Sequence, residues 1–179
     1  LIVIRYAIMK FLTKVSFLLS IMVVKLAETN PKVVEELMRA WANEWIAFYY
    51  YLVMISVVRF KGYIVFAEKL DQVAKEELEH AEELEERLVQ LGESPIKDWT
   101  AIEKIANCPK VYYPDTLEDI KGILQALEEA ETCVINVYER LLILTHDKDK
   151  ATYHLISHIK SEEEEHRTIF EDLRKQLSL

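Results

Sequence analysis

Two short motifs, each a glutamate followed three residues later by a histidine, constrain the fold of this chain most strongly. They are Glu77 with His80 and Glu163 with His166. Residues three apart lie on one face of an α-helix. The other residues on that face, at spacings of three and four, are apolar. Around the first motif they are Leu70, Val73, Leu84 and Leu88, and around the second they are Ile156, Ile159, Phe170, Leu173 and Leu177. The pattern therefore predicts two amphipathic helices with a carboxylate and an imidazole at core positions.

Two further stretches repeat the pattern with one glutamate each, Glu44 and Glu131. Their apolar stripes are Leu37, Ala40, Ala47, Tyr51, Met54 and Val58 in the first stretch and Leu124, Leu127, Val134, Tyr138 and Leu141 in the second. Glu44 precedes Glu77 by 33 residues, and Glu131 precedes Glu163 by 32. The chain thus contains a unit of two long helices twice.

Four core glutamates are costly to bury unless cations compensate their charge. Two divalent cations would balance four carboxylates. One glutamate from each of two helices, with a Glu-x-x-His motif from each of the other two, resembles the di-metal site of ferritin-like bundles. In that arrangement the bridging ligands are Glu77 and Glu163, the terminal carboxylates are Glu44 and Glu131, and the imidazole ligands are His80 and His166.

Oxygen-rich ligation with one imidazole per metal favours iron, with manganese as the alternative, over zinc or copper. We therefore expect two iron ions per subunit. Tyr51 and Tyr138 each follow a core glutamate by seven residues on the same face. Two interpretations of them stay open: packing, or a site role through a hydrogen bond to a ligand or electron donation. A metal-free helical scaffold is the alternative for the whole set, and it would raise the pKa values of the buried acids.

Helix start and stop signals predict an all-α chain. The first helix begins at Asn30 and Pro31 and reaches about Lys61, before Gly62; the second ends near Leu91, before Gly92. A long connection over residues 92–115 holds a short helix within residues 98–106. The third helix, capped by Asp115 or Thr116, extends to about Thr145, and the fourth follows the polar turn 146–150. A long crossover lets the second and third helices run parallel, as in a ferritin-like four-helix bundle.

Residues 1–25 differ from residues 26–179, which we assign to the bundle. They contain four basic and no acidic residues, and the apolar run at 15–24 is too short to span a membrane. An over-extended start with Met22 as the true beginning, an extra helix and an export signal are the three interpretations. The net charge of −9 predicts that the chain repels nucleic acid and attracts cations, although solvated helix faces also account for it.

The two cysteines, Cys108 and Cys133, lie in the long connection and two residues after Glu131. In an intracellular chain they are ordinarily inert thiols. If the crossover folds back over the third helix, they meet as a redox-active pair beside the metals. Sequence separation alone leaves both interpretations open, because it does not give the Cα distance.

Four stretches carry a resemblance to a known family: residues 105–114, 127–133, 148–153 and 162–166. They are similar to the Dps-like proteins of archaea and bacteria, also called thioferritins, over about residues 30–178. The resemblance implies that Cys108 and Cys133 pair near the iron site. It also implies a cytoplasmic mini-ferritin cage that oxidises Fe(II), preferably with hydrogen peroxide rather than oxygen, stores ferric iron and protects against oxidative stress.

Two departures from relatives refine this expectation. Bacterioferritin has a methionine beside its second-helix glutamate for haem, and Leu78 stands here, so we expect no haem. A fifth helix is missing, which favours a shell of twelve subunits, with twenty-four as the alternative. A rubrerythrin-like di-iron peroxidase without storage is the competing function, although the chain has no Cys-x-x-Cys motif for its usual electron-transfer domain.

Overall fold

The computed structural model describes residues 30–94, 96–108 and 119–177, and these form helices joined by turns. Four helices are long and one is short: α2 (Pro31–Phe60), α3 (Ile64–Gln90), α4 (Trp99–Ile105), α5 (Ile120–Thr145) and α6 (Lys150–Gln176). Within the described ranges no residue belongs to a strand. The prediction of an all-α chain with four long helices and a short one in the crossover is confirmed.

The helix ends follow from local chemistry. Gly62 and Gly92 adopt φ values of 86° and 94°, in the left-handed region where glycine is favoured, and each lies two residues after the last residue of a helix. Aspartates cap three helices: Asp98 accepts from Thr100 N–H, Asp119 from Gly122 N–H and Asp149 from Thr152 N–H. These caps satisfy backbone donors that would otherwise lack partners.

The start of the third long helix was predicted incorrectly. It begins at Ile120 rather than near residue 115, because Asp119 supplies the capping carboxylate. Asp115 and Thr116, the expected caps, lie outside the described residues. Residues 1–25 also lie outside them, so the division between that segment and the bundle stays a prediction. No described helix combines the length and hydrophobicity that a membrane span needs.

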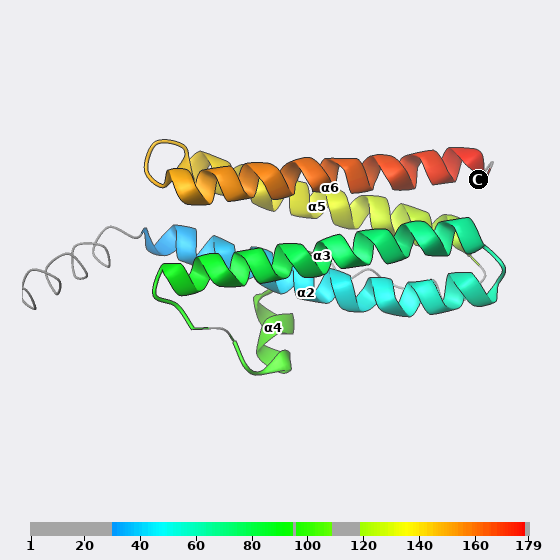
Figure 1. Ribbon diagram of the computed structural model, residues 1–179, viewed down its shortest axis with the longest axis horizontal. Coiled ribbons are helices and arrows are strands. Elements are labelled where there is room, and N and C mark those ends of the chain that lie inside the picture. Colours follow the sequence, from blue (N-terminus) through cyan, green and yellow to red (C-terminus); the bar gives the residue numbers. More distant parts are fainter. Residues whose placement is uncertain (1–29, 95, 109–118, 178–179) are drawn as a thin grey trace, which may run out of the picture. The chain divides into compact units, whose positions relative to one another are not determined.

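The four long helices lie side by side (Figure 1), and contacts between them define their directions. Tyr51 contacts Glu131 while Tyr138 contacts Glu44, so α2 and α5 are antiparallel. Trp41 near the start of α2 donates to Glu85 near the end of α3, so these two are antiparallel as well. It follows that α3 and α5 run in the same direction, as the long crossover predicted.

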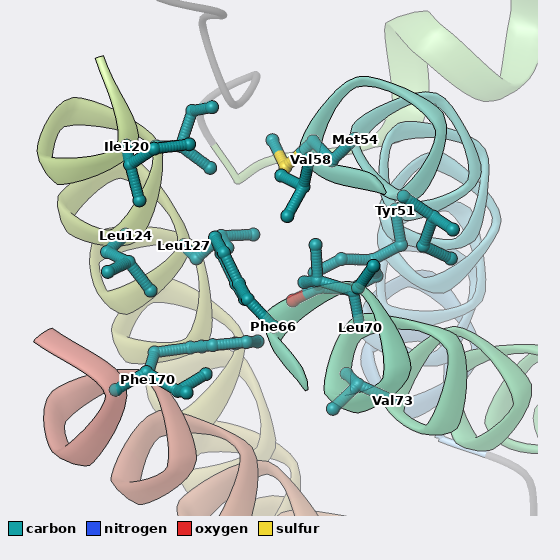
Figure 2. Packing of buried hydrophobic residues seen from close by; sticks show 14 of the residues in the cluster. Tyr51, Met54, Val58, Phe66, Leu70, Val73, Ile120, Leu124, Leu127 and Phe170 are labelled. Atoms are coloured by element: carbon teal, nitrogen blue, oxygen red, sulfur yellow. The ribbon is translucent and has the colours of Figure 1, made fainter. Parts of the chain in front are cut away.

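Two apolar clusters fill the bundle. The first joins residues of all four long helices around Tyr51, Phe66 and Phe170 (Figure 2). The second joins the other halves of the same helices and includes Ile102 of α4. The core glutamates and histidines occupy positions between these clusters along every helix. Packing at both ends therefore holds the polar centre away from water.

Candidate metal centre

The six predicted ligands converge in the middle of the bundle. Four long helices supply them: Glu44 from α2, Glu77 and His80 from α3, Glu131 from α5, and Glu163 and His166 from α6. They form two overlapping groups, one of Glu44, Glu77, His80 and Glu163, the other of Glu77, Glu131, Glu163 and His166. Within each group one atom per residue lies within 4.8 Å of the others. Glu77 and Glu163 belong to both groups, which is the placement that bridging ligands require.

All six side chains are buried, with at most 3% of their surface exposed. Several of their polar atoms nevertheless lack a hydrogen-bond partner: Glu44 Oε2, Glu77 Oε1, both Glu163 oxygens, His80 Nδ1 and His166 Nδ1. His80 Nδ1 lies 3.0 Å from Glu163 Oε1, yet this approach lacks hydrogen-bond geometry. Buried polar atoms are normally satisfied. Carboxylate oxygens and imidazole nitrogens that face one another without hydrogen bonds are arranged as ligands around a cation would be. This set of atoms can therefore hold metal ions.

Two glutamates that sequence reasoning missed orient the imidazoles. His80 Nε2 lies 2.7 Å from Glu162 Oε2, and His166 Nε2 lies 2.7 Å from Glu76 Oε2. A carboxylate oxygen accepts, so each Nε2 carries a proton, and each Nδ1 faces the cluster, where it can bind a metal ion once its own proton is displaced. Outer partners of this kind fix the tautomer of a metal-binding histidine. The available signal was position, since each partner directly precedes a glutamate that is predicted to bridge the metals.

Tyr51 and Tyr138 are packed in the core, and each hydrogen-bonds a predicted ligand; a role in the chemistry of the site stays a prediction. Both are packed in the core, with 2% and 0% of their surfaces exposed. The Tyr51 hydroxyl donates to Glu131, and the Tyr138 hydroxyl donates to Glu44. Burial, followed by the neighbouring carboxylates, raises the pKa of both phenols, so they remain donors. Each terminal carboxylate is thus held by a tyrosine from a different helix.

Without cations, burial and neighbouring charges shift the pKa values of the clustered residues in different directions. Burial, and then the Glu163 charge, raises the pKa of Glu44, Glu77 and Glu131, to about 7 for Glu77. Burial alone would lower the pKa of His80, but neighbouring carboxylates, Glu163 first, raise it to about 9. The pKa of Glu163 is lowered despite burial because two imidazoles adjoin it. Without metal, protons on the groups with raised pKa values balance part of the carboxylate charge. Metal ions that bind these groups displace the protons.

A small cavity of about 20 Å³ adjoins the second ligand group. Its lining comprises Ala47, Tyr50 and Tyr51 of α2, Leu127, Ala130 and Val134 of α5, and the candidate ligands Glu77 and Glu131. A water molecule needs about 10–15 Å³ of such space. The cavity therefore has room for a water-sized molecule beside the carboxylates.

Cys108 and Cys133 form a disulfide that joins the crossover to α5. Their Cα atoms lie 5.7 Å apart, within the usual range for a disulfide. The pairing implied by the family resemblance is confirmed. It ties the crossover to the helix that supplies Glu131, two residues before Cys133.

Comparisons with known proteins agree with this architecture. Residues 34–179 match the model of the ferritin-like domain. The chain belongs to the ferritin-like family. It lies in the Dps-like, thioferritin branch, because it is 32% identical over 142 residues to the DNA protection during starvation protein of Pyrococcus furiosus and carries the paired cysteine. That match covers 79% of this ferritin-like chain and 76% of the relative.

Solved structures of the family superpose closely. A dodecameric thioferritin, the bacterioferritin-related protein of Bacteroides fragilis, matches with a TM-score of 0.79 and 25% identity, covering 86% of this chain and 91% of that one. The bacterioferritin of Rhodobacter capsulatus, described with a metal-free dinuclear site and haem iron, matches with a TM-score of 0.71 and 20% identity over 84% and 89% of the two chains. The second likeness shows the fold alone.

Proposed function

We propose that this ferritin-like chain is a ferroxidase that binds two ferrous ions at the Glu–His cluster, oxidises them and stores the ferric product inside a homo-oligomeric shell. The observation that supports this most is the set of buried carboxylate and imidazole atoms that converge without hydrogen-bond partners. A metal-free scaffold leaves those atoms unexplained, since uncompensated buried carboxylates are costly. Iron is preferred over manganese on the family likeness, and manganese remains compatible with the ligand types.

The two ferrous ions are substrates, and hydrogen peroxide is the proposed preferred oxidant. One turnover would oxidise two Fe(II) to two Fe(III) and convert one peroxide and two protons to two water molecules. The chain supplies ligands, orientation and charge balance, and the electrons come from iron. Protons displaced from His80 and Glu77 on metal binding are available for this reduction. The cavity between α2 and α5 adjoins Glu77 and Glu131, and we propose that it lies on the path by which the oxidant reaches the cluster.

The shell part of the proposal is supported by exposed apolar side chains. Phe60, Ile64 and Val65 at the turn between α2 and α3 are 89%, 50% and 66% exposed. Exposed apolar side chains that lie close together are a feature of contact surfaces, so we propose that this turn contacts another subunit. The Bacteroides fragilis relative is dodecameric, and we propose a shell of twelve copies here, with twenty-four as the alternative.

Protection against oxidative stress follows if the protein consumes both Fe(II) and peroxide. The Pyrococcus furiosus relative is named for DNA protection. A net charge of −9 opposes direct contact with nucleic acid. We therefore propose that any protection operates by removing the reactants rather than by covering DNA.

Iron loading tests the proposal. Apo-protein is mixed with excess Fe(II) without oxygen, peroxide is added, and the iron that co-elutes with protein in gel filtration is measured per chain. Many irons per chain in a large assembly are expected. About two irons per chain in a small oligomer would contradict storage and favour the di-iron peroxidase.

A further inference from the structure

A buried asparagine on α2 holds the crossover cysteine in place. Asn43 is 4% exposed, and its Oδ1 accepts from the backbone N–H groups of Asn107 and Cys108 at 3.1 and 3.2 Å. Its Nδ2 donates to Asn107 Oδ1 at 3.0 Å. Backbone N–H groups only donate, so this orientation of the amide is fixed by its partners. Three hydrogen bonds therefore connect one side chain of α2 to residues 107 and 108.

Asn43 adjoins the ligand Glu44 in sequence but faces another direction. Successive helical residues are about 100° apart around the axis. Glu44 points into the bundle, and Asn43 points to the crossover. On the other side of the disulfide, Cys133 lies on α5 two residues after the ligand Glu131. Cys108 is thus held by α2 through Asn43, and Cys133 belongs to α5. These are the two helices that carry the proposed terminal carboxylates.

These hydrogen bonds do not depend on the sulfur–sulfur bond, because they involve only the amides of Asn43 and Asn107 and the backbone of Cys108. Ile102, Ile105 and Ala106 also pack against the core next to them. We propose that Asn43 is a positioning residue for a reversible dithiol–disulfide couple formed by Cys108 and Cys133. It keeps Cys108 beside Cys133 after reduction, so the two thiols remain ready to close again.

The reaction balances with glutathione as the partner. Opening consumes two glutathione thiols and yields two protein thiols and one glutathione disulfide, and closing is the reverse. Both cysteines are half-buried, so neither is enclosed in the core. If the crossover stays in place after reduction, the Cys108 thiol has a high effective concentration toward the Cys133 thiol. A high effective concentration favours the disulfide. A segment that detaches on reduction loses this advantage.

Equilibration in glutathione redox buffers, followed by alkylation and mass spectrometry, measures the couple. For Asn43→Ala we expect a shift toward the dithiol of about tenfold, which corresponds to about 30 mV, and slower closing from the reduced state. Asn107→Ala removes one of the three hydrogen bonds and should give a smaller shift in the same direction. The matched control is Asn136→Ala, whose amide donates to Thr132 O on the exposed side of α5, and it should behave as the wild type.

Hydrogen exchange decides the mechanism without relying on a variant. In wild-type protein, the amides of Asn107 and Cys108 should be equally protected in the oxidised and reduced forms, because Asn43 accepts from both. In reduced Asn43→Ala they should exchange freely. Loss of protection on reduction of the wild type would overturn the proposal, as would a potential for Asn43→Ala equal to that of Asn136→Ala. If Asn43→Ala does not fold, the wild-type comparison still gives the answer.

Discussion

Each imidazole and each terminal carboxylate of the cluster is held by a residue from a different helix. Glu162 and Glu76 hold the two histidines, and Tyr51 and Tyr138 hold Glu131 and Glu44. Glu77 and Glu163 lack such a partner for some of their oxygens. Side chains oriented before a metal arrives lose less freedom when they bind it. Glu77 and Glu163, the two residues shared by both ligand groups, therefore keep oxygens available for two ions.

Removal of both bridging carboxylates should abolish fast oxidation. For Glu77→Ala with Glu163→Ala, we expect stopped-flow Fe(II) oxidation by peroxide to slow by roughly 100-fold or more, since loss of an outer partner alone typically costs 10–100-fold. The matched control replaces Glu79 and Glu165, which are exposed and two residues further along the same helices. Oxidation at the wild-type rate in the bridging variant would refute the site assignment.

Glu76 and Glu162, the outer glutamates that contact the two histidines, allow a prediction for each metal position separately. Glu162→Ala or Glu76→Ala should weaken the binding of one metal ion by about 10- to 100-fold, because the corresponding imidazole loses its fixed tautomer and orientation. Anaerobic titration with Co(II), followed by its visible absorption, measures each step. Equal affinity in both variants and in Glu79→Ala would show that the histidines do not need these partners.

Helix periodicity made the convergence of the six candidate ligands predictable, because a charged residue in an apolar stripe is visible in the sequence. The outer glutamates were not predictable in the same way. Glu76 meets His166, and Glu162 meets His80, only because α3 and α6 pack antiparallel in one register. That register depends on packing between distant helices rather than on local spacing.

At the scale of helices, the internal repeat predicted the arrangement of contacts. α2 with α3 and α5 with α6 are two copies of one unit, and each unit supplies three of the six candidate ligands. The contacts between units are reciprocal, as Tyr51 with Glu131 and Tyr138 with Glu44 show. The start of α5 was harder to predict, because several residues before Ile120 are also suitable caps and local propensity does not rank them.

The cavity between α2 and α5 provides a test at this scale. Ala130→Leu would fill it, so we expect peroxide-dependent oxidation to slow by about tenfold while Co(II) binding at the cluster stays unchanged, since no ligand is replaced. Ala130→Ser adds a single oxygen and serves as the control. Parallel stopped-flow and Co(II) titrations make the comparison. If oxidation by Ala130→Leu is as fast as in the wild type, the oxidant does not use this cavity.

At the scale of the whole bundle, charge balance links metal binding to stability. Folding raises the pKa of Glu77 from 4.5 to about 7 and that of His80 from 6.5 to about 9. In both cases the folded state holds protons that the unfolded state has released. Stability is then lost as pH rises, between 4.5 and 7 for Glu77 and between 6.5 and 9 for His80. The lowered pKa of Glu163 acts below pH 4.5, outside this window.

The apo-protein should therefore be less stable at pH 9 than at pH 6. For His80 alone the loss is roughly 3 kcal/mol, at about 1.4 kcal/mol per pKa unit. Protein loaded with Co(II) should show a much flatter dependence, because the cation replaces the protons. Thermal unfolding of chelated and loaded samples at both pH values measures this. A melting temperature of the apo-protein that rises toward pH 9 would contradict the account, and chelation with no loss of stability would favour a metal-free scaffold.

The most direct test of the di-metal site is anomalous X-ray diffraction at the iron edge from crystals soaked anaerobically with Fe(II). The account predicts two anomalous peaks per chain, both between Glu77 and Glu163, one adjoining His80 and the other adjoining His166. The same peaks should disappear in crystals of the variant that lacks both bridging carboxylates. Iron bound elsewhere with no density between these glutamates would contradict the central claim.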